Sequence, residues 1–412
     1  RCTDHSADNT ALGSVIHILR RIPSPSKKIQ LNSDRASLFL EAYPTHQSLS
    51  KLIHSVRMKP APFILFVPSY GDGGTGELVR STMLANAVSK RWPKVRIEFL
   101  LPDAPGTEQL MPFPKTCHVG PRSTKPHFCN TEIKRLKPDL VIFDSGLPGS
   151  TLRLCKRLRI RTVFISCRPH QCNKAFRLDR LRFLDEHWHQ RSYLTTPAFS
   201  RGQRLVSRLG NTHRITFDTC LAAAPDSEDD ISPALASLLA QPFVLLSPGG
   251  GGYRVQGELV GNLYVEVAER IKAISGISCL TVLGPLHEGP VNNHQTLAIK
   301  EVTPGRMISL MQRAKVVITN GGHGLGQALA CGAACIAAPL GGNDQPSRIA
   351  AYSAAGLIQA AEPTVDSLTA MAMTLLIPEN NAQQKQKLTK LKCINGIPLM
   401  CRAIARLLPD LT

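Results

Sequence analysis

Two glycine clusters in the second half of the sequence have the residue types and positions of an anion-binding site. The first is Ser247–Gly252, and the second is the run Asn320-Gly321-Gly322-His323-Gly324. Each cluster follows a short apolar run and precedes a helical pattern, so it would place unpaired backbone N–H groups at a positively polarised helix N-terminus. Glycine also lets a phosphate approach the backbone. Either cluster alone is more typical of a tight turn, but two in one domain could hold one diphosphate.

Three carboxylates in the first half are candidates for a general base. Asp72 lies inside a further glycine-rich turn, Gly71–Gly76, and Glu77 follows it directly, while Asp144 follows the apolar run Leu140–Phe143. All three come after predicted strand ends, the edge of an open α/β sheet where ligands bind. Each has an alternative without chemistry: Asp72 as a turn residue, Glu77 as a first-turn charge favoured by the helix dipole, and Asp144 as a helix cap.

His187 and His189 flank Trp188 and have the spacing of a metal-ligand pair. Spacing places no third ligand beside them, and the twelve cysteines include no CxxC pair. We therefore favour a strand or loop with one aromatic side chain packed inward, and we predict no metal site. The cysteines in apolar surroundings indicate free thiols and a reducing, cytoplasmic compartment.

The elements that must position these residues are βα units. From Pro62 onward, short apolar runs alternate with helical stretches, which predicts parallel sheets. A long helix is expected from about Val255 to Ile274. The predicted strands are Phe63–Pro68, Val95–Leu101, Leu140–Phe143 and Thr162–Ser166 in the first half, then Phe243–Leu246, Cys279–Leu283, Lys315–Thr319 and Cys335–Ala338. The fold class is α/β, with two Rossmann-like domains facing each other across a cleft.

Composition shifts divide the chain into five parts. The segment Ala222–Ser232 is acidic, contains proline and has few apolar residues, which is typical of a linker. The predicted parts are an N-terminal extension (1–60), a first Rossmann-like domain (61–225), a linker (226–235), a second Rossmann-like domain (236–395) and a C-terminal helix (396–412).

The net charge of +19 lies entirely in the first half of the chain. Residues 1–210 contain 34 Lys and Arg against 15 Asp and Glu, whereas residues 211–412 contain 15 of each kind. Such an excess favours a phosphate-bearing partner, either an anionic membrane surface or a phosphorylated acceptor, over a merely solvated face. Aromatic residues make up 5 % and form no stripe with basic ones, so nucleic acid is not an expected partner. No run approaches the roughly 18 apolar residues of a membrane span.

The segment Ile318–Ala360 resembles the nucleotide-sugar signature of GT-B glycosyltransferases. The matching elements are Gly321-Gly322, Gln327, Ala328 to Gly332, Pro339 and Asp344-Gln345. Their spacing is most similar to that of the bacterial enzyme that adds N-acetylglucosamine to the lipid-linked peptidoglycan precursor. The run Gly73-Gly74-Thr75-Gly76 is similar to the acceptor-side glycine-rich loop of that enzyme.

The resemblance implies a UDP-sugar donor held mainly by the second domain, with no other cofactor and no metal. It implies that Asp344 and Gln345 bind hydroxyl groups of the sugar and that Gln327 occupies the position of the ribose-binding glutamate. The uracil is expected near Leu283–Leu286 or Thr303–Met307. The residues implied to contact the diphosphate are Ser247, Gly249, Gly250, Gly251, Gly322 and His323.

Two departures from the family pattern affect the chemistry. Gln327 lacks the charge of glutamate, so Gln327→Glu is expected to tighten uridine binding. Leu78 stands where the family has a histidine, which leaves Asp72, then Glu77, then Asp144 as the base. The expected reaction is an inverting, metal-independent transfer of a hexose or N-acetylhexosamine to an unknown acceptor hydroxyl, lipid- or phosphate-linked, at the inner face of a membrane. The alternatives are a UDP-sugar epimerase or hydrolase of the same fold, and a non-catalytic nucleotide-sugar-binding subunit.

Overall fold

The computed structural model describes residues 61–69, 75–102, 112–118, 124–192, 194, 199–223, 231–291 and 295–411. The predicted extension (1–60) lies outside the described residues. So do Gly71, Asp72, Gly73 and Gly74 of the first glycine-rich turn and residues 226–230 of the predicted linker.

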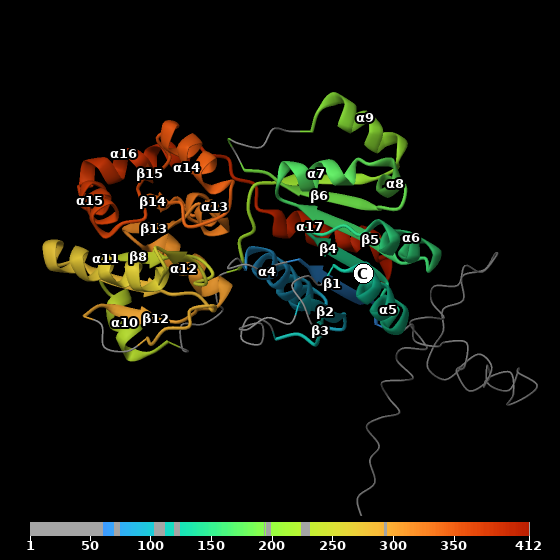
Figure 1. The fold of residues 1–412 in the computed structure, drawn as a ribbon, viewed down its shortest axis with the longest axis horizontal. Helices are drawn as coiled ribbons and strands as arrows, with labels where there is room; N and C mark the ends of the chain where they lie inside the picture. The colour runs from blue at the N-terminus through green and yellow to red at the C-terminus, as the bar shows by residue number, and fades with distance from the viewer. Residues whose placement is uncertain are drawn as a thin grey trace, which may run out of the picture. The chain divides into compact units, whose positions relative to one another are not determined.

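The first domain is built on a sheet of seven parallel strands in the order β3-β2-β1-β4-β5-β6-β7 (Figure 1). Strand β1, an inner strand of this sheet, is buried at every position, because a parallel strand covered on both faces needs a continuous apolar run. The elements are β1 (Phe63–Pro68), α4 (Gly76–Arg91), β2 (Arg96–Pro102), β3 (Lys115–His118), α5 (Pro126–Leu136), β4 (Leu140–Asp144), α6 (Gly149–Arg157), β5 (Arg161–Ser166), α7 (Pro169–Ala175), α8 (Leu178–Leu181), β6 (Glu186–Gln190), α9 (Arg201–Leu209) and β7 (His213–Phe217).

The second domain repeats this plan with six parallel strands in the order β12-β11-β8-β13-β14-β15. Helices α11 and α15 pack against each other and against the sheet, and their apolar residues share one core cluster. The elements are α10 (Pro233–Leu239), β8 (Phe243–Ser247), β9 (Arg254–Val255), β10 (Glu258–Leu259), α11 (Val260–Ser275), β11 (Ser278–Val282), β12 (Leu297–Ile299), α12 (Pro304–Arg313), β13 (Val316–Asn320), α13 (His323–Ala330), β14 (Cys335–Ala338), α14 (Gln345–Ala354), β15 (Gln359–Ala360), α15 (Val365–Leu376) and α16 (Pro378–Thr389).

The long helix expected from Val255 begins five residues later. Residues 254–259 form the small hairpin β9-β10, which turns at Gln256 and Gly257. Both turn residues have positive φ, 51° and 89°, and two such residues in succession favour a hairpin over a helix. Val255 and Leu259 have helical spacing, which explains why the sequence pattern extended the helix over them.

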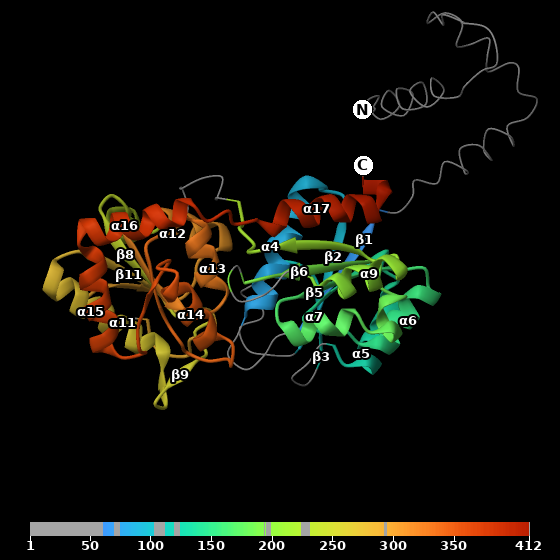
Figure 2. The same cartoon turned by 90° about the horizontal axis from the view of Figure 1, so that it is seen from above.

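The C-terminal helix α17 (Gly396–Leu407) returns to the first domain, where it packs on α4 and β7. It lies beside α4 in the views of Figures 1 and 2, although the two helices are far apart in the sequence. Its apolar side chains, among them Met400 and Ile404, belong to the core cluster that contains Phe66, Trp188 and other strand residues. The helix therefore completes the first domain.

The chain passes between the domains twice, and the two crossings are joined by hydrogen bonds. The N–H of Asp218 donates to the carbonyl of Ile394 (3.0 Å), and the N–H of Gly396 donates to Thr219 (2.8 Å). The side chain of Asn395 accepts from the N–H of Leu221 at 3.1 Å and caps α17. Among the helices that the structure describes, none combines the length and apolarity that a bilayer crossing requires.

Candidate active site

Both sheets have a switch point, where strand order reverses and the loops of two neighbouring strands diverge. In the second domain this point lies between β8 and β13, which are paired directly. The glycine turn after β8 and the turn after β13 therefore come together at one sheet edge. These are the two clusters in which the sequence predicted an anion site.

Asn320 joins the two glycine turns. It is the last residue of β13 and is 4 % exposed. Its Nδ2 group donates to the carbonyl of Pro248 at 2.9 Å, and its Oδ1 accepts from the N–H of Gly322 at 2.9 Å. Gly249, with φ of 92°, has no room for a Cβ, which would lie 2.8 Å from Asn320 Nδ2. The sequence placed Asn320 in the turn without giving it this role.

Helix α13 begins at this junction with no side-chain cap. The first N–H groups of an α-helix have no partner within the helix, so an uncapped N-terminus favours a bound anion. Its first residue, His323, lies close to the start of α4 in the first domain, since a Cβ on Gly76 would be 3.8 Å from the Cβ of His323. The N-termini of the two helices therefore approach each other.

A cavity of about 1100 Å³ lies at these helix ends and is lined by both domains. It takes in parts of both segments considered for the uracil, through Gly284, Pro285, Thr303, Pro304 and Met307. The predicted site residues that line it are Thr75, Gly76, Glu77, Ser247, Gly249, Gly250, Gly322, His323, Gln327, Asp344 and Gln345. The structure thus brings eleven of the predicted residues to one cavity.

Gly251 and Asp144 do not line this cavity. A Cβ on Gly251 would lie 2.5 Å from the carbonyl oxygen of Leu283, so this glycine serves close packing against the neighbouring turn. Asp144 is fully buried beneath the cavity floor formed by α4.

Both oxygens of the Asp144 carboxylate accept hydrogen bonds from neighbouring side chains. Its Oδ2 accepts from Arg80 Nε (2.9 Å) and Ser81 Oγ (3.3 Å), and its Oδ1 accepts from Arg80 Nη2 (2.6 Å). Ser145 Oγ lies 3.3 Å from Oδ1 and 3.2 Å from Glu77 Oε1, and its one proton serves one of these two carboxylates at a time. Burial raises the pKa of Asp144, and its ion pair with the Arg80 guanidinium opposes that shift. With both oxygens held by Arg80 and no place in the cavity lining, Asp144 fits a positioning role and not that of the base considered from the sequence.

Arg80 is connected to His323 by hydrogen bonds through Gln190. Its Nη1 donates to Gln190 Oε1 at 2.6 Å, and because arginine can only donate, the Gln190 amide orientation is fixed. The Nε2 group of Gln190 then donates to His323 Nδ1 at 3.3 Å. A neutral His323 must therefore carry its proton on Nε2.

His323 is neutral and presents an unused donor. Burial, reinforced by Arg80 and Arg348, lowers the pKa of His323 to about 3. Its Nε2 atom is buried without a hydrogen-bond partner among the described residues. An N–H donor of this kind beside an uncapped helix N-terminus is suited to a phosphate oxygen.

Of the three carboxylates considered as a base, Glu77 is the one that the structure places in the cavity wall, since Asp72 lies outside the described residues and Asp144 does not line the cavity. Glu77 stands in the first turn of α4, and its Oε1 accepts from Ser145 Oγ at 3.2 Å. Glu77 stands at the start of α4, opposite His323 at the start of α13. A carboxylate that can accept a proton therefore lies across from an imidazole that can donate to an anion. Arg168, which follows β5, and Tyr253 also line the cavity and were not given roles from the sequence.

Gln327 is held by the chain that leaves the first domain. It is 6 % exposed, and its Nε2 group donates to the carbonyl of Cys220 at 3.0 Å. A glutamate here would turn a carboxylate oxygen toward that carbonyl. The amide is therefore explained by the domain crossing, which short sequence motifs do not reveal.

Asp344 and Gln345 stand at the start of α14, and both are anchored. Arg348 donates to Asp344 Oδ2 and to the carbonyl of Gly321, which ties this helix to the glycine turn. Gln345 Oε1 accepts from the N–H of Leu340 at 3.0 Å, which leaves its Nε2 group to donate to a ligand.

No protein-family model and no curated protein sequence matches this chain. Solved structures do match it in fold. UGT2 of Phytolacca americana, complexed with UDP-2fluoro-glucose and pterostilbene, has a TM-score of 0.57 at 13 % identity, with 84 % of this chain and 100 % of that chain covered.

Two further structures are similar over the same length. CalG4, the calicheamicin glycosyltransferase, has a TM-score of 0.52 at 13 % identity and covers 85 % of this chain and 98 % of its own. A putative UDP-N-acetylglucosamine 2-epimerase from Listeria monocytogenes has a TM-score of 0.52 at 12 % identity, with 85 % and 97 % covered. These similarities, with the two parallel sheets, confirm the predicted fold class: two Rossmann-like domains in the GT-B arrangement.

Proposed function

We propose that this chain is a glycosyltransferase that takes its sugar from a UDP-sugar. The observation that carries the proposal is the junction at Asn320, where two glycine turns and the uncapped end of α13 meet at the switch point of the second domain. That position in a Rossmann-like sheet is where nucleotide phosphates bind. The signature residues Asp344 and Gln345 lie in the wall of the same cavity.

In this proposal, the diphosphate binds to the N–H groups of α13 and of the turn Ser247–Gly250, with His323 Nε2 donating to a phosphate oxygen. As UDP leaves, its growing negative charge is stabilised by these fixed dipoles and N–H groups, so we propose that the transfer needs no divalent cation in the cleft. Asp344 and Gln345 would bind hydroxyl groups of the sugar, a hexose or an N-acetylhexosamine.

Glu77 is the proposed general base. It accepts the proton of the acceptor hydroxyl while the hydroxyl oxygen forms a bond to the anomeric carbon, and the bond from that carbon to the diphosphate oxygen breaks. A single displacement inverts the configuration at the anomeric carbon. Asp72, predicted from the sequence, lies outside the described residues and stays a second candidate.

The acceptor is proposed to reach the cleft from an anionic membrane surface. Helix α9 supports this part of the proposal, because Leu205 and Leu209 are 58 % and 80 % exposed and Arg201, Arg204 and Arg208 stand on the same short helix. Apolar and basic side chains together are typical of helices that lie in a membrane interface. Cosedimentation with phosphatidylglycerol vesicles, compared with phosphatidylcholine, should be reduced by Leu209→Asp.

The test of the donor assignment is a calorimetric and UDP-release screen. The full chain is titrated with UDP, UDP-glucose, UDP-galactose, UDP-N-acetylglucosamine, UDP-glucuronate and the dTDP and GDP analogues, with EDTA present. We expect one UDP-sugar to bind in the micromolar range and to release UDP slowly without an acceptor. If none of these nucleotides binds, the proposal is refuted.

Two glutamate variants test the base. Glu77→Gln should bind the donor as the wild type does and lower the transfer rate by about 10²–10⁴-fold. Glu379→Gln is the matched control, since Glu379 is also a first-turn glutamate, on α16, away from the cavity. Equal rates for both variants would remove Glu77 as the base. Sugar isomerisation without UDP release would instead indicate an epimerase, and stoichiometric binding without turnover a non-catalytic subunit.

A further inference from the structure

Strand β6 carries two buried histidines on one face of the first sheet, outside the cleft. His187 and His189 are 1 % and 2 % exposed, and Trp188 between them points to the opposite face, where its Nε1 donates to Glu186 Oε2 at 2.6 Å. The inward-packed aromatic residue expected from the sequence is therefore present. The two imidazoles are neighbours because side chains alternate along a strand.

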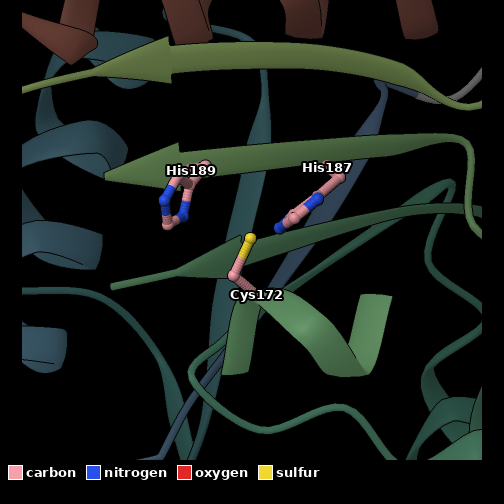
Figure 3. A group of neighbouring side chains, drawn as sticks. All are labelled: Cys172, His187 and His189. Carbon is pink, nitrogen blue, oxygen red and sulfur yellow. The ribbon is translucent and has the colours of Figure 1, made fainter. Parts of the chain in front are cut away.

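The structure supplies the third donor that sequence spacing did not. Cys172, on α7, points its sulfur toward the two imidazoles (Figure 3). One ligand atom from each of the three residues lies within 4.8 Å of the other two. The third ligand comes from a helix that packs on the strand, so it has no fixed distance from the histidines in the sequence.

Ser166 stands among these donors. Its Oγ lies 2.8 Å from His187 Nε2 and 2.9 Å from His189 Nδ1, and its hydroxyl also interacts with the Cys172 thiol. One hydroxyl thus has the two imidazole nitrogens and the sulfur around it. Two nitrogens, one sulfur and one oxygen make up a four-ligand set.

We propose that Cys172, His187 and His189 bind one Zn²⁺ ion, with Ser166 Oγ as the fourth ligand. Thiolate and imidazole are the ligands that Zn²⁺ favours, and four-coordination is typical of its structural sites. In a tetrahedral site the ligand atoms would be about 3.3–3.6 Å apart, so binding draws the three donors, which now lie within 4.8 Å of one another, closer together. Zn²⁺ displaces the thiol proton of Cys172, which is released to solvent.

The surroundings hold both imidazoles in place. Phe164, Phe176 and Phe199 pack on the rings with centroids 5.3–5.6 Å apart. Arg214 lies over the ring of Phe199.

One feature limits the affinity. His187 Nδ1 is buried without a hydrogen-bond partner among the described residues, whereas metal-bound histidines commonly donate their second N–H to an acceptor. We therefore expect binding about 10–100-fold weaker than in a site whose histidines are all supported in this way.

The ion would stiffen the rim of the cleft. Ser166 is followed by Cys167 and Arg168, and His189 by Gln190, all three of which line the cavity. Arg168 is also the N-cap of α7, the helix that carries Cys172. A metal at this site would tie the segment from Ser166 to Cys172 to the segment His189–Gln190.

The test uses the full chain and does not depend on transfer activity. The metal content of the purified protein is measured, and Co²⁺ is then exchanged into the site. We expect one equivalent of Co²⁺ with tetrahedral d–d bands and a thiolate-to-cobalt charge-transfer band. Zn²⁺ should raise the unfolding midpoint, and Mg²⁺ should not.

Three variants identify the ligands. Cys172→Ser should abolish the charge-transfer band, and His189→Gln should weaken Co²⁺ binding at least tenfold. Cys155→Ser is the control, because Cys155 is a buried thiol on α6 outside the cluster and its loss should leave the spectrum unchanged. Failure of the folded wild type to bind Co²⁺ or Zn²⁺ would overturn the proposal, as would an unaltered band in Cys172→Ser. If Cys172→Ser does not fold, His189→Gln decides alone.

Discussion

The ion pair between Arg80 and Asp144 gives the sharpest prediction, because it separates a positioning role for Asp144 from a catalytic one. Both side chains are almost completely buried, at 3 % and 0 % exposed. Asp144→Asn removes the negative charge and leaves the Arg80 guanidinium buried with one acceptor oxygen where there were two. Breaking such a pair from one side costs about 3–5 kcal/mol.

The assay is thermal and urea unfolding of the purified variants. At about 2–4 °C per kcal/mol, Asp144→Asn should lower the unfolding midpoint by roughly 6–20 °C. Arg80→Met should cost a similar amount. The double variant Arg80→Met/Asp144→Leu should recover much of the loss, since neither charge then remains unpaired.

The control is Asp366→Asn. Asp366 pairs with Arg270 at the surface, where both side chains are largely exposed, so its loss should change the free energy of unfolding by less than about 1 kcal/mol. If Asp144→Asn kept the wild-type stability and lost the transfer activity by several orders of magnitude, Asp144 would be the base and the positioning role would be refuted.

Three further predictions concern the cavity. The pKa of His323 is lowered to about 3, so the folded state resists protonation, whereas the unfolded state accepts a proton near pH 6.5. The free energy of unfolding of the wild type therefore falls as the pH drops below 6.5. In urea unfolding, His323→Gln should lose about 2 kcal/mol less of this free energy than the wild type between pH 7 and pH 5. Gln327→Glu replaces the group that donates to the Cys220 carbonyl, so it should lower the free energy of unfolding by about 1–3 kcal/mol in the same assay and should not tighten nucleotide binding. Tighter UDP binding would restore the ribose role inferred from the sequence. Asn320→Asp should weaken UDP binding at least tenfold by calorimetry, since it sets a carboxylate oxygen against the Pro248 carbonyl beside the diphosphate site; unchanged affinity would contradict the proposed junction.

The sequence predicts the sheets well where strands are buried on both faces. The run Phe63–Pro68 is a strand with those same bounds, and Cys335–Ala338 is another. Strand β6 escaped this reasoning because its sequence, EHWHQ, is polar although four of its five residues are buried. Ser166 and Trp188 form hydrogen bonds with its buried His187, His189 and Glu186, and an apolar period cannot reveal such contacts.

The sequence predicts those site residues that lie within short motifs of the second domain. The glycine turns and the residues of the second-domain signature reach one cavity because all of them follow strand ends of one sheet or begin its helices. The links through Arg80, Gln190 and Cys220 were not predictable, since their partners lie 64 to 133 residues away along the chain. Cys172 was missed because it lies on α7, and a helix that packs on a strand has no fixed sequence distance from it.

The return of α17 to the first domain bears on the order in which the protein can fold during synthesis. Met400, Ile404 and other residues of this helix belong to the core cluster that holds Phe66 and Trp188. The ribosome makes them after the whole second domain, so the second domain can close while the first still exposes apolar surface on α4 and β7. The domain made first is therefore finished last, and until then its exposed surface is a natural target for a chaperone.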